Sequence, residues 1–423
     1  MSPTADGEDF MDEIRCGQDL LHVIVRTGWV SGRIVFSISH VTIAELHHDE
    51  ELRRREFPVT GEKVFVAHAG ICPIPRRVSE AIRDYAEQST RGDQETLVPA
   101  FQMHRTRELA ANLIGAEIGE VAFVGPTSLA LSLVASGLSF EPGDTVLVYL
   151  DDFPSNVYPW LALAERGVEV KFLEVEKLGG IHLEGVLNQV DDRTRLVALA
   201  SCHFASGFRI DVDAIGKALR ERGILFCLDA IQTVGAFPTS IKHVDFLAAD
   251  AHKWMLGPCT AGIMYVRKEL QDQLRPPIHG WHNLRCPDFV ALDELEFQPD
   301  ARRYEVGSAN LLGLVGLHAA FELMAEIGVD NIGRELLRKR AWMTPALQAK
   351  GYSVLHAEAS EANSSGIVTI VREGEDIVAL HAKLEAAKVM SSVRSDRSGG
   401  KYLRFSPHYY NTDEEMNRIL ELL

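Results

Sequence analysis

From Lys63 onward, short apolar runs alternate with longer helical stretches, and this alternation limits the possible folds more than any other feature. The runs are almost continuously apolar, which is typical of strands buried on both faces of a sheet. Such alternation predicts an α/β fold with a mostly parallel sheet flanked by helices. The expected strands are 64–67, 121–124, 145–149, 168–173, 196–200, 224–228, 246–249 and 261–266, and the expected helices include 107–114, 128–139 and 212–222.

The chain has 423 residues, a length that suggests two or three domains. We expect residues 1–56 to form an N-terminal extension, disordered over 1–12 and helical over 44–55. Residues 57–310 are expected to form a large α/β domain, and residues 311–423 a smaller α+β domain. The elements expected in the smaller domain are a helix at 311–327, strands at 367–371 and 402–406, and a final helix after Thr412 with three carboxylates in its first turn.

Charge and cysteine usage exclude several classes of protein. The net charge of −17 disfavours binding to nucleic acid or to an anionic membrane. Residues 20–43 are apolar but are interrupted by charged residues and glycine, so we expect neither a membrane span nor a signal peptide. The six cysteines form no C-x-x-C pair, so no metal site is expected. Their scatter predicts reduced thiols in a cytoplasmic protein.

In two segments, a predicted buried strand is followed by an ionisable side chain that could take part in a reaction. The strand predicted at 224–228 leads into Asp229, with Gln232 three residues later. In parallel sheets such a strand end is where ligands bind, although an aspartate there is also a common cap. The next apolar strand leads into Asp250-Ala-His-Lys253-Trp-Met-Leu-Gly-Pro258. Lysine is rarely buried, and burial lowers the pKa of its amine, as formation of an imine requires.

Together these segments resemble the fold-type I pyridoxal-phosphate enzymes, specifically the class V aminotransferase group. This group includes cysteine desulfurases, kynureninase and isopenicillin N epimerase-like proteins, and the resemblance runs from about Phe57 to the C-terminus. It implies a seven-stranded-type sheet with a smaller C-terminal domain. It also implies that Lys253 holds pyridoxal 5′-phosphate as a Schiff base. Asp229 would pair with the pyridinium nitrogen, and Gln232 would hydrogen-bond the 3-oxygen of the ring.

Further motifs of the resemblance concern the rest of the cofactor. Thr127 and Ser128 follow a strand and open a helix, where free N–H groups and hydroxyls suit a phosphate, although the turn alone is an ordinary helix start. His252 matches a family histidine near the phosphate. Phe153 matches the aromatic residue that stacks on the ring, where desulfurases carry a histidine. Ser206, with His203 in the same loop, is expected to face the ring or the substrate.

The resemblance also assigns residues to the substrate and to a second subunit. Arg404 matches the arginine that clamps the α-carboxylate of the substrate, a task that suits a planar guanidinium. His68 is expected to line the part of the site that receives the substrate side chain. Ser308 matches a hydroxyl residue that reaches the phosphate bound by the other subunit, which implies a homodimer with shared sites.

Two departures from the desulfurase pattern bear on the reaction. Residues 391–400 match the loop that carries the nucleophilic cysteine of desulfurases, yet they contain none, and no cysteine follows Cys286. A persulfide route is therefore not expected. Asp250 stands where many desulfurases carry a phosphate-binding serine. Either this carboxylate faces elsewhere, or the phosphate is held mainly by the three hydroxyl residues Thr127, Ser128 and Ser308.

The sequence therefore predicts a pyridoxal-phosphate enzyme that acts on an amino acid or a related amine, with Lys253 as the general base at Cα. Transamination is the first expected outcome. A lyase of the cysteine or kynurenine type and an epimerase remain open, because the shared steps use the same residues. A catalytically silent relative that only binds ligands is the alternative from another class. The sequence does not identify the substrate.

Overall fold

The computed structural model describes residues 27–30, 33–36 and 41–423. The chain divides into two compact units, Met1–His40 and Val41–Leu423. In the first unit, strands β1 (Thr27–Val30) and β2 (Arg33–Phe36) form an antiparallel hairpin. The disorder predicted for 1–12 falls outside the described residues.

The second unit is built around a seven-stranded, mostly parallel sheet, which confirms the predicted fold class. Only β10 runs antiparallel to its two neighbours. All five residues of β9 and of β10 are buried, as expected for strands covered on both faces. The strand order is β4 (Val121–Phe123), β10 (Gly262–Val266), β9 (Phe246–Asp250), β8 (Leu225–Asp229), β7 (Thr194–Ala200), β5 (Thr145–Val148) and β6 (Glu169–Phe172).

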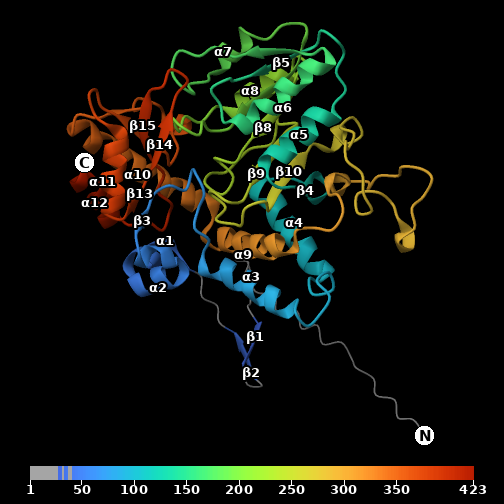
Figure 1. Cartoon of the computed structure of the whole chain (residues 1–423), viewed down its shortest axis with the longest axis horizontal. Helices are drawn as coiled ribbons and strands as arrows, with labels where there is room; N and C mark the ends of the chain where they lie inside the picture. Colours follow the sequence, from blue (N-terminus) through green and yellow to red (C-terminus); the bar gives the residue numbers. More distant parts are fainter. Residues whose placement is uncertain (1–26, 31–32, 37–40) are drawn as a thin grey trace, which may run out of the picture. The chain divides into compact units, whose positions relative to one another are not determined.

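Helices cover both faces of this sheet. One face packs on α4 (Ala100–Ile114), α7 (Leu183–Leu187), α8 (Val212–Arg220) and α9 (Leu311–Ile327), and the other on α5 (Thr127–Gly137) and α6 (Tyr158–Leu161). Helix α3 (Arg76–Gln88) lies beside α9, with Val78 against Ala319 and Ala320 (Figure 1). Short 3-10 helices occupy Pro58–Gly61, Ile118–Glu120, Pro154–Asn156, Ala162–Arg166, Lys268–Leu270, Pro287–Phe289, Ala301–Tyr304 and Glu361–Asn363.

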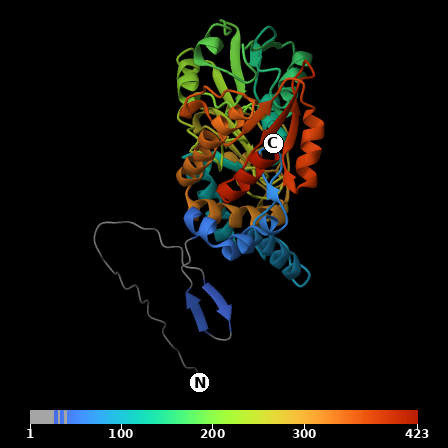
Figure 2. The same cartoon turned by 90° about the vertical axis from the view of Figure 1, so that its left-hand side faces the viewer.

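The C-terminal segment forms a smaller α+β arrangement beside the main sheet (Figure 1 and Figure 2, orange to red). Its antiparallel sheet has the order β11 (Ser353–Val354), β12 (Val368–Val371), β15 (Lys401–Phe405) and β14 (Ser392–Ser395). The helices are α10 (Val329–Ala349), α11 (Ile377–Ala386) and α12 (Asp413–Leu422). The strand expected at 64–67 is shorter, β3 (Val64–Phe65), and pairs with β13 (Val389–Met390) instead of joining the main sheet.

Two helices, α1 (Ile43–His48) and α2 (Glu50–Glu56), replace the single helix expected at 44–55. The break lies at Asp49, whose carboxylate accepts a hydrogen bond from Leu52 N at 2.9 Å and so starts α2. The buried Arg53 then pairs with Glu415 of α12 at 2.8 Å. Helices α1 and α2 thus belong to the same compact unit as the rest, while the boundaries at 56 and 310 stay predictions.

Helices α9 and α10 meet at Gly328, where a φ of 82° favours glycine. The two helices are bent by 74° relative to each other. Within the described ranges, no single helix has the length and apolar content needed to cross a membrane, and this bent pair has them only when its two helices are taken together.

The capping box of α12 provides a test of how firmly the C-terminal helix is held. Thr412 Oγ1 accepts a hydrogen bond from Glu415 N at 3.4 Å, and Glu415 accepts one from Thr412 N at 3.1 Å. We expect Thr412→Ala to lower the free energy of unfolding by about 1 kcal/mol, measured by urea denaturation, because an N-cap acceptor is lost. Thr412→Ser keeps the hydroxyl and serves as the control. An equal loss in both variants would assign the effect to the methyl group.

Candidate active site

Lys253 lies just beyond the carboxyl end of β9 and is only 6% exposed, so the predicted burial is confirmed. Its Nζ lies 5.3 Å from the centroid of the Phe153 ring. The pKa of this amine is lowered to about 8, mainly by burial, with Arg404 and Arg394 acting in the same direction and Asp229 opposing the shift. A substantial fraction of the amine is therefore neutral near neutral pH, which an imine-forming lysine requires.

Asp229 ends β8 and is buried next to Lys253, as expected from the sequence. One carboxylate oxygen accepts a hydrogen bond from Ile231 N at 3.0 Å. The pKa of this carboxyl is raised to about 7, mainly by burial and also by the nearby Asp152. A buried carboxylate of this kind gains stability from a cationic partner. A protonated pyridine nitrogen is such a partner, so Asp229 fits the cofactor.

Asp152 is a second buried carboxylate in the site, and sequence reasoning did not single it out. It accepts hydrogen bonds from Phe153 N at 2.7 Å, Asn156 Nδ2 at 3.0 Å and Ala200 N at 3.1 Å. Burial raises its pKa to about 6, and these donors together with Lys253 oppose that shift. Asp152 ties Phe153 to β7 and adds negative charge around Asp229. The sequence offered one signal for Asp152, which is that it directly precedes Phe153, a predicted cofactor-binding residue.

The turn before α5 offers hydroxyls and free N–H groups at a helix start, where a phosphate is stabilised. Asp250 N donates to Thr127 Oγ1 at 2.9 Å, which fixes the buried threonine against β9. Ser128 Oγ lies 2.7 Å from Ser155 Oγ. A Cβ on Gly125 would lie 2.6 Å from the backbone of Thr260, so only glycine allows this close approach. These features fit a phosphate of the cofactor.

Asp250 uses its carboxylate within its own turn. One oxygen accepts from Ala251 N at 2.8 Å, and the other lies 2.9 Å from His252 Nδ1 and accepts from Thr260 N at 3.1 Å. Of the two sequence-based alternatives, these contacts favour the one in which the carboxylate faces away from the phosphate. The same contact orients the ring of His252, which leaves Nε2 of that ring for another partner.

Gln232 is buried and held at both ends of its amide. Its Nε2 donates to Ala69 O at 3.1 Å, and its Oε1 accepts from Trp254 Nε1 at 2.8 Å. One amide N–H remains for the predicted contact with the 3-oxygen of the ring, because the NH₂ group carries two donors.

Two histidines have both ring nitrogens engaged by the protein. His68 Nδ1 lies 2.9 Å from Ser406 O, and its Nε2 lies 2.7 Å from the Tyr410 hydroxyl. His203 contacts Ser206 Oγ at 3.0 Å and Asp151 O at 3.0 Å. Burial lowers the pKa of both rings to about 4. Neutral rings with no free nitrogen hold the site in shape, and nothing in the geometry supports direct binding of substrate by His68.

Arg404 comes from β15 and is completely buried. Its Nη1 donates to Phe204 O, whereas Nε and Nη2 have no hydrogen-bond partner among the residues that the structure describes. Burial lowers the pKa of this guanidinium. Unpaired donors on a buried cation are costly, and a carboxylate would satisfy two of them at once. This arrangement agrees with the predicted clamp for the α-carboxylate.

Ser308 lies apart from this cluster. It is exposed, and its hydroxyl donates to Glu95 Oε1 at 3.3 Å. In the described part of the chain, no hydrogen bond joins it to another predicted site residue. Its predicted role in the site of a second subunit stays a prediction.

The hairpin formed by β14 and β15 contacts the segment that leads into Asp152. Arg397 at its tip pairs with Asp151 at 2.7 Å and donates to Leu150 O at 2.8 Å. Asp396 accepts from the Tyr402 hydroxyl at 2.6 Å and stiffens the turn. Arg394 in β14 lies near Lys253 and was missed in the sequence, where it reads as one of two arginines in a polar stretch.

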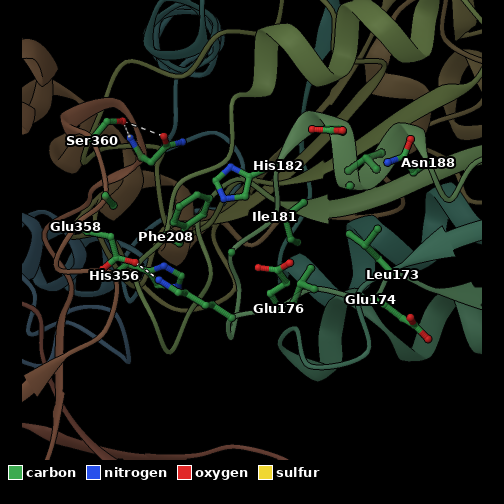
Figure 3. A pocket seen from close by; sticks show the side chains of 18 residues that line it. Leu173, Glu174, Glu176, Ile181, His182, Asn188, Phe208, His356, Glu358 and Ser360 are labelled. Atoms are coloured by element: carbon green, nitrogen blue, oxygen red, sulfur yellow. Dashed lines mark hydrogen bonds and ion pairs between the residues drawn. The ribbon is translucent and has the colours of Figure 1, made fainter.

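A cavity of about 770 Å³ lies elsewhere in the unit and contains none of the predicted site residues (Figure 3). His182, Phe208 and His356 are among its lining residues. His356 Nε2 lies 2.8 Å from Leu178 O, and Lys177 pairs with Glu358. Because His356, Lys177 and Glu358 already have partners and the cavity holds none of the predicted site residues, we assign no ligand to it.

Comparison with known families gives the same assignment as the geometry. The family model described as aminotransferase class-V matches residues 64–419. The chain belongs to this family. The match includes every predicted site residue, from His68 to Arg404. Together with the buried lysine, membership of the class-V aminotransferase family identifies pyridoxal phosphate as the cofactor.

Similar proteins carry two kinds of name. A probable cysteine desulfurase from Methanothermobacter thermautotrophicus is 29% identical over 388 residues, which cover 88% of this chain and 96% of the relative. An uncharacterized aminotransferase, YcbU, from Bacillus subtilis is 30% identical over 380 residues, which cover 89% of this chain and 98% of the relative.

Solved structures confirm the fold. The apo cysteine desulfurase of Thermococcus onnurineus NA1 superposes with a TM-score of 0.79 at 26% identity, covering 88% of this chain and 96% of that chain. A variant of C-DES with glycine covalently linked to its pyridoxal-phosphate cofactor superposes with a TM-score of 0.79 at 20% identity, covering 87% of this chain and 98% of that one.

The lowered pKa of Lys253 predicts how the apoprotein takes up its cofactor. Only the neutral amine attacks the aldehyde, and its fraction rises with pH through about 8 instead of the usual 10.5. The rate at which the visible absorption band forms from apoprotein and pyridoxal phosphate should therefore have its midpoint near that lower value. In Asp229→Asn the midpoint should move down, because the opposing anion is lost. A wild-type midpoint near the usual value would contradict the burial effect.

Proposed function

We propose that this class-V enzyme removes the Cα proton of an amino acid, with Lys253 as the base. The observation that supports the proposal is the convergence of a buried amine of lowered pKa, the buried Asp229 and the two unpaired donors of Arg404. Bound pyridoxal phosphate supplies an electron-accepting ring that stabilises negative charge at Cα. The protein supplies the base, the orientation and the exclusion of water.

Each residue has a separate task in this scheme. Arg404 binds the α-carboxylate and thereby fixes which bond of Cα points toward Lys253. Asp229 keeps a proton on the pyridine nitrogen, because a buried anion favours the cationic form of a partner. Phe153, whose ring lies close to Lys253 Nζ, would pack against the cofactor ring and limit its tilt. Lys253 accepts the Cα proton and can return it to the substrate.

For the outcome of the reaction we propose a β-lyase that uses no enzyme thiol. The names of several relatives as probable cysteine desulfurases favour bond breaking at Cβ. The β14–β15 hairpin contains no cysteine to receive sulfur. In the balanced step, the Cα–H electron pair forms a Cα=Cβ bond, the proton goes to Lys253, and the Cβ substituent leaves with its own electron pair. Hydrolysis of the released enamine gives a 2-oxo acid and ammonia.

Transamination is the second candidate. It is supported by the name of the Bacillus subtilis relative and by the presence of one well-placed proton carrier, Lys253. Its products differ, because the amino group stays with the cofactor and no ammonia is released. Measuring 2-oxo acid and ammonia together, in a screen of amino acids, therefore separates the two outcomes.

Replacing the lysine tests the proposal. Lys253→Ala should lose the visible band that borohydride bleaches, and should lose activity by a factor on the order of a thousand, because no base remains. Lys401→Ala removes an exposed lysine from the β14–β15 hairpin and should keep both. Retention of the band in Lys253→Ala, confirmed by peptide mapping after reduction, would refute the assignment.

We also propose a homodimer in which Ser308 serves the phosphate of the partner's site. Several exposed apolar side chains could be buried in such an interface, among them Ile71, Phe101, Leu129, Phe289 and Val290. Burying apolar side chains of this size is favourable in a subunit interface.

Sedimentation of the holoenzyme should give the mass of a dimer. Ser308→Ala should release pyridoxal phosphate about 10-fold more readily, because a hydrogen bond to a charged group is lost. Ser353→Ala removes another exposed serine and is the matched control. A monomer that keeps its cofactor equally well in both variants would contradict the shared site.

A further inference from the structure

Two arginines share one face of the C-terminal sheet beside Lys253. In the register of the hairpin, Arg404 of β15 lies opposite Ser392 of β14, and Arg394 lies two residues farther along β14. Residues two apart on a strand point to the same side, so Arg394 and Arg404 are diagonal neighbours on one face. A Cβ built on Gly70 would lie 3.5 Å from Arg394 Nη2 and 3.7 Å from Arg404 Nη2. Both guanidiniums therefore border the same small space.

Neither guanidinium is neutralised by the protein. Arg404 leaves Nε and Nη2 without partners, and Arg394 Nη1 donates only to the carbonyl of its neighbour Val393, at 2.8 Å. No carboxylate in residues 41–423 lies within 4.0 Å of either guanidinium. Burial lowers the pKa of Arg394, and no nearby acid opposes it. For Arg404, the charge of Arg394 adds to the effect of burial.

The acids around the site are already committed to other partners. Asp229 and Asp152 act on Lys253, and they accept the backbone and side-chain hydrogen bonds described above. Asp151 is paired with Arg397, and Asp396 accepts from the Tyr402 hydroxyl. A buried cation beside a half-buried one, without counter-ions, is unfavourable unless anions arrive from outside. The α-carboxylate of a substrate accounts for one of them.

We propose that Arg394 binds a second anionic group, so that the substrate is an amino acid with an acidic side chain. This inference rests on the proposed function, in which Arg404 takes the α-carboxylate. Arg394 is half-buried at the edge strand β14, whereas Arg404 is deep in the sheet. Because both guanidiniums border the space beside Gly70, the side chain of a substrate held by Arg404 can reach Arg394. A guanidinium binds a carboxylate or a similar planar anion through two parallel hydrogen bonds.

The test compares anionic amino acids with their neutral isosteres on the holoenzyme. L-aspartate is paired with L-asparagine and L-glutamate with L-glutamine, and binding is followed by the change in the visible spectrum. In the wild type, at least one acidic member should bind on the order of 10-fold or more tighter than its amide. In Arg394→Gln that ratio should fall to within about 3-fold, while the affinity for L-alanine changes by less than about 3-fold.

A second measurement does not depend on turnover. Isothermal titration of the holoenzyme should detect tighter binding of succinate, which has two carboxylates, than of butyrate, which has one. Arg394→Gln should remove this difference. Lys401→Gln is the matched control, because it removes a positive charge from β15 on the opposite face of the sheet and should preserve the difference.

The outcomes separate this inference from the proposed function. If wild-type protein forms the visible band but does not discriminate acids from amides, the inference is overturned and the proposed function stands. If Arg394→Gln weakens the binding of acidic and neutral amino acids equally, Arg394 assists Arg404 in binding the α-carboxylate. This outcome also overturns the inference. If wild-type protein forms no band with pyridoxal phosphate, the proposed function itself fails.

Discussion

The amine of Lys253 is buried among charges of both signs, and the arrangement of the site follows from the cost of that burial. A protonated lysine in an apolar interior is unfavourable, so the protein favours the neutral amine that imine chemistry needs. Asp229 and Asp152 limit how far the pKa of Lys253 falls, and Arg394 and Arg404 lower this pKa. The main sheet makes this possible, because β9 and all of β8 after Leu225 are buried up to the edge where Asp229 and Lys253 emerge. The same enclosure keeps water from competing for the groups that must meet the substrate.

Much of the fold could be predicted from the sequence because the strands of the main sheet are short, apolar and separated by helices. The predicted strands at 196–200 and 261–266 agree with β7 and β10 to within two residues at each end. The helix expected at 311–327 is α9, and capping by Asn310 explains its start. The strand at 64–67 was placed less well. Its apolar pattern reports burial but not the partner, and the partner, β13, lies more than 300 residues away in the sequence.

The site could be predicted only in part, for the same reason. Lys253 and Asp229 follow strands, so their positions at one sheet edge follow from topology. His68 could not be judged from its neighbours, because its two nitrogens are occupied by Ser406 and Tyr410, which come from the other end of the chain. Arg394 looked like one charge in a polar loop until the register of β14 placed it beside Arg404. Contacts between distant segments decided each of these cases.

The base and the two arginines come from different sheets. Lys253 belongs to the loop after a strand of the seven-stranded sheet, while Arg394 and Arg404 stand on a hairpin of the four-stranded one. Replacements in the hairpin can therefore change which molecules bind while Lys253 and Asp229 stay in place, although loss of either arginine would let the pKa of Lys253 rise. In evolutionary terms, such a separation lets one scaffold acquire new substrates while the residues that carry out proton transfer are kept.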